Sequence, residues 1–448
     1  MTPLRRQLRT PQSAAAILIL ALCLAYAGDA GHGFIKDDFR WIRETRIDAV
    51  SDVPRLLGRT DGFYRPLVSL SFSVSSAAGG LTPRQYGLTN LALLVAAAAL
   101  VWRLARTLGL AEGPALVAAG AWAFNFHGIN MAVLWISGRT ALIVTIGALL
   151  TAIASVSGRT WLAGACCLLA MLSKEEAVLL PILVAAWCAY DAEGPATRRL
   201  ATAARRAWPC FAAMAIYLAL RLRTDAFWPA DAPAYYRLSA APSLLAGNLV
   251  QYADRALTWP LVVALVMYAA SAGKARFDGH ARRVVVFGAL WIACMFALTV
   301  FVPVRSSLYA VLPSAGSALA AGAVASAASR AAPARAGMAM TALALLPLLL
   351  LPIYWLRNER WTRLADLSST VLNQVRAAAE REPGRRIVIV DNPAERFNLD
   401  AAFGSLWPDA SALLLPPGTV ADLATDATSA PADAVVLRLE GGRLTQER

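Results

Sequence analysis

The chain has 448 residues, of which 58% are hydrophobic and only 16% are charged. Soluble proteins carry about 45–50% apolar and about 25% charged residues, so this composition excludes a set of soluble domains or a disordered chain and indicates a protein that spans a membrane several times. The net charge of +13, from 42 Lys+Arg against 29 Asp+Glu, does not indicate nucleic-acid binding, because the basic residues form short clusters between apolar stretches.

Apolar stretches recur along the whole chain, and a helix that crosses a bilayer needs about 20 such residues. We predict eleven transmembrane helices, near residues 12–28, 86–108, 113–127, 139–157, 160–173, 175–190, 207–221, 247–270, 283–303, 307–327 and 336–356. With the N-terminus in the cytoplasm, the basic clusters of five loops fall on the cytoplasmic side, as the positive-inside rule requires, although the first external loop also carries several arginines. The Ala- and Arg-rich composition favours a bacterial inner membrane.

The first predicted external loop, residues 28–85, contains the adjacent carboxylates Asp37 and Asp38. Neighbouring like charges raise one another's pKa, which suits a carboxylate to general-base work. The alternative is a solvated acidic turn. Apolar residues from Ile42 to Leu57 recur at spacings of one helix face, with Trp and Arg interleaved. This pattern predicts an amphipathic helix in the membrane interface, which would hold the carboxylates beside a lipid-borne substrate.

Further polar residues lie at the ends of later apolar stretches, on the same predicted side. They are His127 and Arg139 in the second external loop, Lys174 and Glu175 in the third, and Arg305 and Tyr309 in the fifth. Ionisable residues at such depths are functional candidates by default. The alternatives are that the arginines only anchor helices at the interface and that Lys174 and Glu175 only cap helix ends. Any chemistry then lies on the outer face, where an activated substrate would arrive in the lipid.

The last ninety residues lack long apolar stretches and have the composition of a soluble domain. We expect a polar helix over 362–381 and short strands at 387–390 and 434–437. The sequence therefore predicts two domains. Residues 1–356 form an all-α polytopic membrane domain, and residues 357–448 form a small extracytoplasmic α/β domain.

Five segments together resemble the C-type superfamily of integral-membrane glycosyltransferases. Within it, they are most similar to the branch of the protein O-mannosyltransferases and the transmembrane-and-tetratricopeptide proteins. The segments are Asp37-Asp38, Tyr64-Arg65-Pro66-Leu67, His127 through Arg139, Ser173-Lys174-Glu175, and Leu308-Tyr309 with Pro313-Ser314. Three features depart from that branch. The Arg-Tyr that usually begins the last segment is here Arg305-Ser306-Ser307-Leu308-Tyr309, Thr140 stands where an Asp is common, and no tetratricopeptide array follows.

The resemblance implies a hexosyltransferase, such as a mannosyltransferase, that uses a polyprenyl-phosphate-linked sugar. Asp37, or otherwise Asp38, would deprotonate an acceptor hydroxyl on a protein or glycan, and the sugar would be transferred with inversion. The donor phosphate and sugar would contact Arg65, His127, Arg139, Lys174, Glu175, Arg305 and Tyr309. Some relatives need a divalent metal, for which the sequence offers no ligand set beyond the two Asp residues. A transporter or flippase, or a polymerase-like assembly protein for lipid-linked glycans, stays an alternative.

Overall fold

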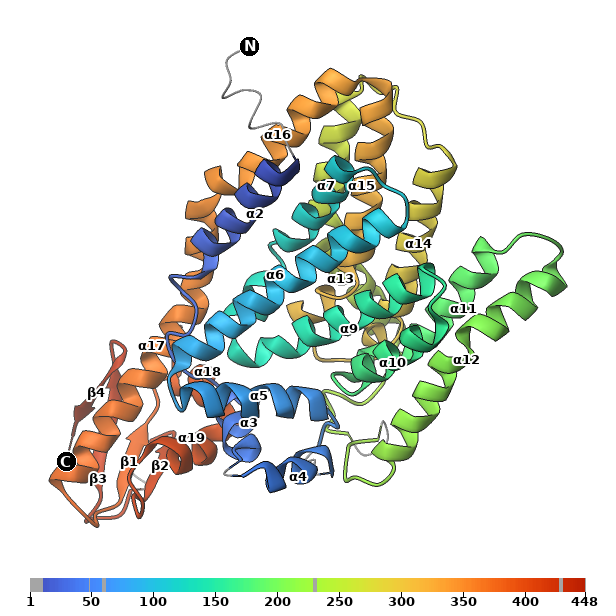
Figure 1. The fold of residues 1–448 in the computed structure, drawn as a ribbon. Coiled ribbons are helices and arrows are strands. Elements are labelled where there is room, and N and C mark those ends of the chain that lie inside the picture. Colours follow the sequence, from blue (N-terminus) through green and yellow to red (C-terminus); the bar gives the residue numbers. More distant parts are fainter. Residues whose placement is uncertain (1–10, 48, 59–61, 229–231, 427–429, 448) are drawn as a thin grey trace.

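The computed structural model describes residues 11–47, 49–58, 62–228, 232–426 and 430–447. The chain is mostly helical, and a small sheet lies near its C-terminus (Figure 1). Each of the eleven apolar stretches contains a helix. These helices are α2 (Pro11–Tyr26), α6 (Pro83–Thr107), α7 (Glu112–Ala123), α9 (Arg139–Val156), α10 (Thr160–Met171), α11 (Leu180–Asp191), α12 (Ala196–Arg221), α13 (Pro242–Ala270), α14 (Gly279–Phe296), α15 (Ser314–Ala331) and α16 (Pro333–Leu349).

The predicted count of eleven membrane spans is not confirmed. Within the described residues, four segments are long and apolar enough to cross a membrane: Pro83–Thr107, Ile136–Val156, Pro242–Ala270 and Gly279–Phe301. A fifth is added if α16 and the helix after it, which are bent by 44° relative to each other, form one span. Helices α7, α10 and α11 have 12 residues each. Such a helix is about 18 Å long, which is shorter than the hydrocarbon core of about 30 Å.

Small residues let the helices of the bundle approach closely. A Cβ atom added to Gly288 on α14 would lie 2.4 Å from the carbonyl oxygen of Gly316 on α15, and one added to Gly316 would lie 2.5 Å from that of Gly288. The two backbones therefore touch at this crossing, as in other small-residue contacts between apolar helices. Helix α15 also packs on α7 and α13, so it lies inside the bundle.

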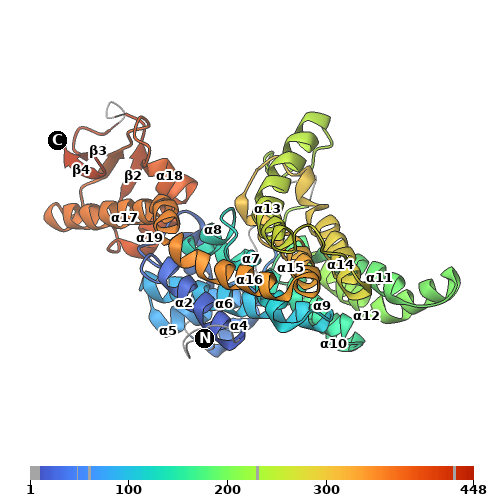
Figure 2. The same cartoon turned by 90° about the horizontal axis from the view of Figure 1, so that it is seen from above.

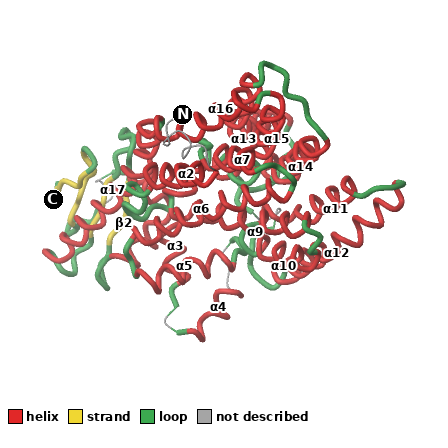
Figure 3. The backbone as a smooth tube through the Cα atoms, turned by 45° about the horizontal axis from the view of Figure 1, so that its top comes forward, coloured by secondary structure: helices red, strands yellow, loops and turns green. Residues whose placement is uncertain are grey.

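The segment between α2 and α6 forms separate short helices instead of one amphipathic helix. They are α3 (Asp37–Thr45), η1 (Val50–Asp52), α4 (Val53–Gly58) and α5 (Pro66–Gly79). The predicted continuous helix across this region is wrong for two reasons. Arg46 has an extended backbone that ends α3, and Pro54 favours the first turn of a new helix over a helix interior. Figure 3 shows α3, α4 and α5 as a group beside the longer helices.

The C-terminal part begins with a helix that continues from the bundle. Its elements are α17 (Leu351–Arg381), β1 (Ile387–Val390), α18 (Leu399–Phe403), α19 (Trp407–Leu414), β2 (Ala421–Ala424), β3 (Val435–Glu440) and β4 (Arg443–Gln446). The strand order is β2-β1-β3-β4, with β1 parallel to both neighbours and β3 antiparallel to β4. The predicted polar helix and the two predicted strands are confirmed. The proposed domain boundary after residue 356 falls inside α17, so this helix joins the two parts.

The C-terminal part packs on the short helix that carries the acidic pair. The rings of Phe39 and Phe403 stack with centroids 5.7 Å apart. The backbone N–H of Lys36 donates to the carbonyl oxygen of Ala402 at 2.9 Å, and Asp409 forms an ion pair with Arg43 on α3 at 2.7 Å. One continuous apolar core includes residues of α3, α5, α17 and the sheet. Figure 2 shows the sheet and α17 at one end of the molecule, with α11 and α12 at the other. The C-terminal part therefore holds α3 in place.

We expect Phe403→Ala to destabilise the protein by about 3–5 kcal/mol, because it removes a fully buried ring that stacks on α3. Thermal unfolding of the purified protein in detergent measures the loss, and amide hydrogen exchange should increase first in α3. The matched control is Phe277→Ala, since the Phe277 side chain is exposed. Equal melting temperatures for the two variants would contradict the docking role of Phe403.

Candidate functional site

A cavity of about 470 Å³ lies where the start of α3, the start of α5 and two loops of the bundle meet. Five of the residues predicted from the sequence line it. They are Asp37, Arg65, Lys174, Arg305 and Tyr309. These residues come from segments that lie far apart along the chain, from Asp37 to Tyr309, so the cavity exists only in the folded protein. Its Tyr235 and Tyr236 were not predicted from the sequence, because they carry no charge and lie outside the motifs.

The two adjacent carboxylates point to different places. Asp37 lines the cavity, whereas Asp38 is fully buried outside it. The carboxylate of Asp38 accepts hydrogen bonds from the backbone N–H of Ile35 at 3.0 Å and from the backbone N–H of Ser137 at 2.7 Å. It also accepts one from the Ser137 hydroxyl. Neighbouring residues on a helix point about 100° apart, so one faces the cavity and the other ties α3 to the segment before α9.

The Asp37 side chain is open to the cavity. Desolvation by the surrounding protein raises the pKa of its carboxyl above the ordinary value, while the charges of Arg65, Arg40 and Lys36 act in the opposite direction. Burial also raises the pKa of Asp38, to about 7, although its hydrogen bonds from Ser137 and Ile35 lower it. Asp37 is therefore the carboxylate that combines a raised pKa with access to the cavity, which is the combination that a general base needs.

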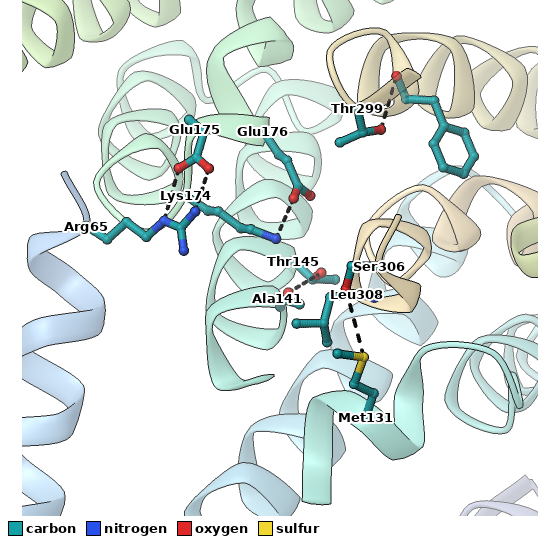
Figure 4. A network of polar contacts seen from close by, with 11 residues as sticks. Arg65, Met131, Ala141, Thr145, Lys174, Glu175, Glu176, Thr299, Ser306 and Leu308 are labelled. Carbon is teal, nitrogen blue, oxygen red and sulfur yellow. Dashed lines mark hydrogen bonds and ion pairs between the residues drawn. The ribbon is translucent and has the colours of Figure 1, made fainter. Parts of the chain in front are cut away.

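Arg65 and Glu175 form an ion pair at the edge of the cavity (Figure 4). The Arg65 Nε donates to Glu175 Oε2 at 3.0 Å, and the guanidinium lies 4.1 Å from the centre of the Phe63 ring. Burial raises the pKa of Glu175, but the charge and hydrogen bonds of Arg65 outweigh it and hold that pKa at about 2. Glu175 is thus a permanent anion that orients Arg65, and it does not line the cavity itself.

Lys174 and Glu176 form a second ion pair, and both side chains are almost fully buried (Figure 4). The Lys174 Nζ lies 5.0 Å from the centre of the Tyr309 ring, a favourable cation–π distance. Glu176 was not among the residues predicted from the sequence, because nothing in the sequence shows that the Lys174 side chain turns toward it. This pair holds Lys174 at the cavity wall.

Arg139 joins helices inside the bundle and does not face the cavity. Its side chain is fully buried and does not line the cavity. The guanidinium donates to Asn90 Oδ1 at 3.0 Å, to Ser75 Oγ at 3.0 Å, and to the carbonyl oxygens of Ser71 and Tyr86 at 3.2 and 3.1 Å. With its donors engaged on α5 and α6, Arg139 joins these helices to α9. The expectation that it contacts a donor phosphate does not fit this geometry.

Arg305 is the basic residue whose donors face the cavity most freely. Its Nε donates to Asn248 Oδ1 at 2.8 Å, which fixes the guanidinium and leaves the two terminal nitrogens for a ligand. Among the described residues, no carboxylate lies within ion-pair distance of Arg305. A Cβ atom added to Gly247 would lie 2.6 Å from Arg305 Nη2, so the glycine provides the space that the guanidinium occupies.

Two further hollows adjoin the cavity. A mostly apolar groove of about 230 Å³ shares Phe63 and Tyr309 with it. Tyr217 and Trp228 line it further on, and Glu175, Glu176 and Arg221 are its charged residues. On another side lies a polar cavity of about 600 Å³, which contains His127 and shares Arg305. Burial lowers the pKa of His127. The structure thus places His127 apart from Asp37, in a neighbouring chamber.

No described group of three or more His, Cys, Asp and Glu residues is arranged to hold a metal ion. Asp37 and Asp38, the pair that the sequence offered as partial metal ligands, face different surroundings. The two carboxylates therefore do not form a shared ligand set.

The sequence matches no protein-family model and no curated protein. A solved structure with a similar backbone is the arabinofuranosyltransferase AftD from Mycobacteria, determined by single-particle cryo-EM, with 16% identity and a TM-score of 0.45. The similarity covers 93% of this chain and 33% of that chain, so this protein spans about a third of the length of AftD. At this level of similarity, neither the activity nor the substrate named for AftD transfers to this chain.

Proposed function

We propose that this protein is a membrane glycosyltransferase that moves a sugar from a polyprenyl-phosphate-linked donor to an acceptor hydroxyl. The observation that carries the proposal is one cavity in which a carboxylate with a raised pKa, Asp37, shares the space with Arg305, a cation without a carboxylate partner among the described residues. A carboxylate base and a fixed cation for a leaving phosphate are the two groups that this transfer requires.

In the proposed step, the acceptor oxygen attacks the anomeric carbon while its proton passes to the Asp37 carboxylate. The bond between the anomeric carbon and the phosphate oxygen breaks, and its electron pair leaves with the lipid phosphate. Attack from the face opposite the leaving group inverts the anomeric centre. The terminal nitrogens of Arg305 stabilise the charge on the departing phosphate. Arg65 and Lys174, each paired with a glutamate, present hydrogen-bond donors at the cavity wall without adding net charge.

The apolar groove beside the cavity suits the hydrocarbon part of such a donor. Its aromatic lining, including Tyr217 and Trp228, continues into the cavity through Phe63 and Tyr309. A polyprenyl chain in the groove would leave its phosphate near Arg305. We further propose that the site opens on the outer face of a bacterial inner membrane, that the C-terminal part is extracytoplasmic, and that the sugar is a hexose such as mannose.

Purified protein in detergent, incubated with a polyprenyl-phosphate hexose and candidate protein or glycan acceptors, tests the proposal. We expect release of free polyprenyl phosphate together with a glycosylated product. Proteoliposomes loaded with a fluorescent lipid-linked sugar test the transporter alternative in parallel. Movement of that lipid between leaflets without release of polyprenyl phosphate would replace the enzyme by a flippase.

Activity should fall on the acidic side at a pH above the ordinary Asp pKa of 3.8, because Asp37 must be ionised and its pKa is raised. Arg40 lowers that pKa, so Arg40→Gln should move the acid limb of the kcat/KM profile to higher pH. The profile is measured from pH 4 to 8 for wild type and Arg40→Gln. Arg84→Gln, which removes an exposed arginine away from the cavity, is the control. An unmoved or lowered acid limb in Arg40→Gln would contradict Asp37 as the base.

A further inference from the structure

The polar cavity next to the proposed catalytic cavity is lined by an unusual excess of arginines. Its cations are Arg255, Arg305, Arg357, Arg360, Arg363 and Arg396. The single acidic residue in its lining is Glu359, which lies 3.3 Å from Arg363 in an ion pair. Among the described residues, none of the other five arginines lies within ion-pair distance of a carboxylate. Of these six arginines, only Arg305 has a role in the proposed transfer reaction.

These arginines are held in place without losing their charge. Arg360 lies over the Trp361 ring, with its guanidinium 5.5 Å from the ring centre, and Arg396 lies 5.3 Å from that of Phe397. Arg357 donates to the carbonyl oxygen of Phe126 at 3.0 Å. The Nη1 of Arg255 is buried and has no hydrogen-bond partner within the described structure. A buried donor without a partner is costly, so Arg255 retains hydrogen-bonding capacity that no described protein group uses.

The charge of the cavity exceeds what the donor of the proposed reaction can neutralise. A phosphodiester between a lipid and a sugar carries one negative charge, and Arg305 alone can receive it. A concave surface lined by five further cations concentrates multiply charged anions. The occupant should therefore carry several anionic groups and be distinct from the donor.

The position of the arginine cavity relates it to the acceptor. It shares Met131, Arg305 and Ser306 with the cavity that contains Asp37, so the two cavities adjoin at Arg305. Its lining is polar, whereas the groove on the other side is apolar and suits the lipid chain. Arg396 and Phe397 belong to the C-terminal part, between β1 and α18, and lie against the α17 residues that complete the wall. The C-terminal part thus contributes directly to this site.

We propose that the arginine cavity binds the charged portion of the acceptor, and that the acceptor is a polyanionic glycan bearing several carboxylate or phosphate groups. This inference rests on the proposed transferase function of the neighbouring cavity. The acceptor hydroxyl lies near Asp37 while the anionic groups of the same molecule pair with Arg255, Arg357, Arg360 and Arg396.

Binding to the purified full-length protein, measured by titration calorimetry in detergent, tests the inference. The probe is trigalacturonate, and maltotriose is its neutral counterpart. Wild type should bind trigalacturonate and not maltotriose, with an affinity that falls as salt increases. The double variant R360Q/R396Q should lose about tenfold in affinity, since each exposed arginine contributes modestly. The control R381Q/R443Q removes two arginines from the same helix and domain outside the cavity, and it should bind as wild type does.

Two results would overturn the inference: equal binding of both trisaccharides by wild type, or equal trigalacturonate affinity in R360Q/R396Q and in the control. A third arm uses lipid nanodiscs with and without phosphatidylglycerol. If R360Q/R396Q weakens binding only to the anionic nanodiscs, the cavity binds lipid headgroups and the inference also fails.

The variant Asp37→Asn separates this inference from the proposed function. Trigalacturonate binding should survive in Asp37→Asn, because the carboxylate is outside the arginine cavity. If transfer also survives in that variant, the proposed function fails while the anion site stands. If transfer is lost but the arginine variants bind trigalacturonate normally, the function stands and the anion site fails.

Discussion

Asp37→Asn should lower the rate of sugar transfer by about 100- to 10,000-fold, the range that general-base catalysis contributes. The amide keeps the shape of the side chain in the cavity but cannot accept the proton of the acceptor hydroxyl. Asp37 accepts no hydrogen bond from another described residue that would be lost, so the folded structure should be retained. The assay is the release of polyprenyl phosphate from a lipid-linked hexose, and donor affinity is measured separately. We expect kcat to fall and donor affinity to change little.

The neighbouring Asp38→Asn variant is the matched control, since it makes the same chemical change one residue along. The Asp38 carboxylate accepts hydrogen bonds from Ile35 and Ser137 in a fully buried setting. An amide there turns an NH2 group toward some of those donors, so we expect a lower melting temperature. A melting temperature that falls in Asp37→Asn instead, with full activity, would assign the structural role to Asp37 and remove it from the mechanism.

Arg139→Met should destabilise the protein by about 2–5 kcal/mol, because each buried polar group that loses its hydrogen-bond partner costs about 1–3 kcal/mol. The methionine fills much of the space but leaves Asn90 Oδ1, the Ser75 hydroxyl and two carbonyl oxygens without their donor. Since these groups belong to α5 and α6, the loss should loosen both helices against α9. The change in the free energy of unfolding is measured by adding a denaturing detergent stepwise to the protein in a mild detergent.

Arg139→Lys should recover part of the lost stability, because an ammonium group keeps the charge but cannot reach all the acceptors of the planar guanidinium. Arg103→Met, on the exposed face of α6, is the control for removing an arginine from the same region. A stable Arg139→Met protein that has lost affinity for the lipid-linked sugar would show that Arg139 binds the donor phosphate after all.

Much of the helical architecture can be predicted from the sequence. Each apolar stretch became a helix, because a run such as 139–157 satisfies its backbone hydrogen bonds internally wherever it packs. The two strands predicted near Ile387 and Val435 were found for a similar reason, since their apolar runs are short and end at turns. Strands β2 and β4 were missed, because both have only four residues, Ala421–Ala424 is interrupted by an Asp, and Arg443–Gln446 is mostly polar. Among the described residues, only four or five helical segments are long and apolar enough to cross a membrane. The positions of the helices could therefore be predicted better than the number of membrane crossings.

The candidate site could likewise be predicted only in part from the sequence. The sequence by itself determined which residues carry charge at the ends of the apolar stretches, because chemical type and local spacing are properties of the chain. Only the tertiary structure decided that Asp37 faces the cavity and Asp38 does not. It also decided that the guanidinium of Arg139 is hydrogen-bonded to α5 and α6, whereas the terminal nitrogens of Arg305 face the cavity. Those outcomes depend on which helix packs against which face of α3 and α9. Such packing joins residues far apart in the chain, and no local pattern records it.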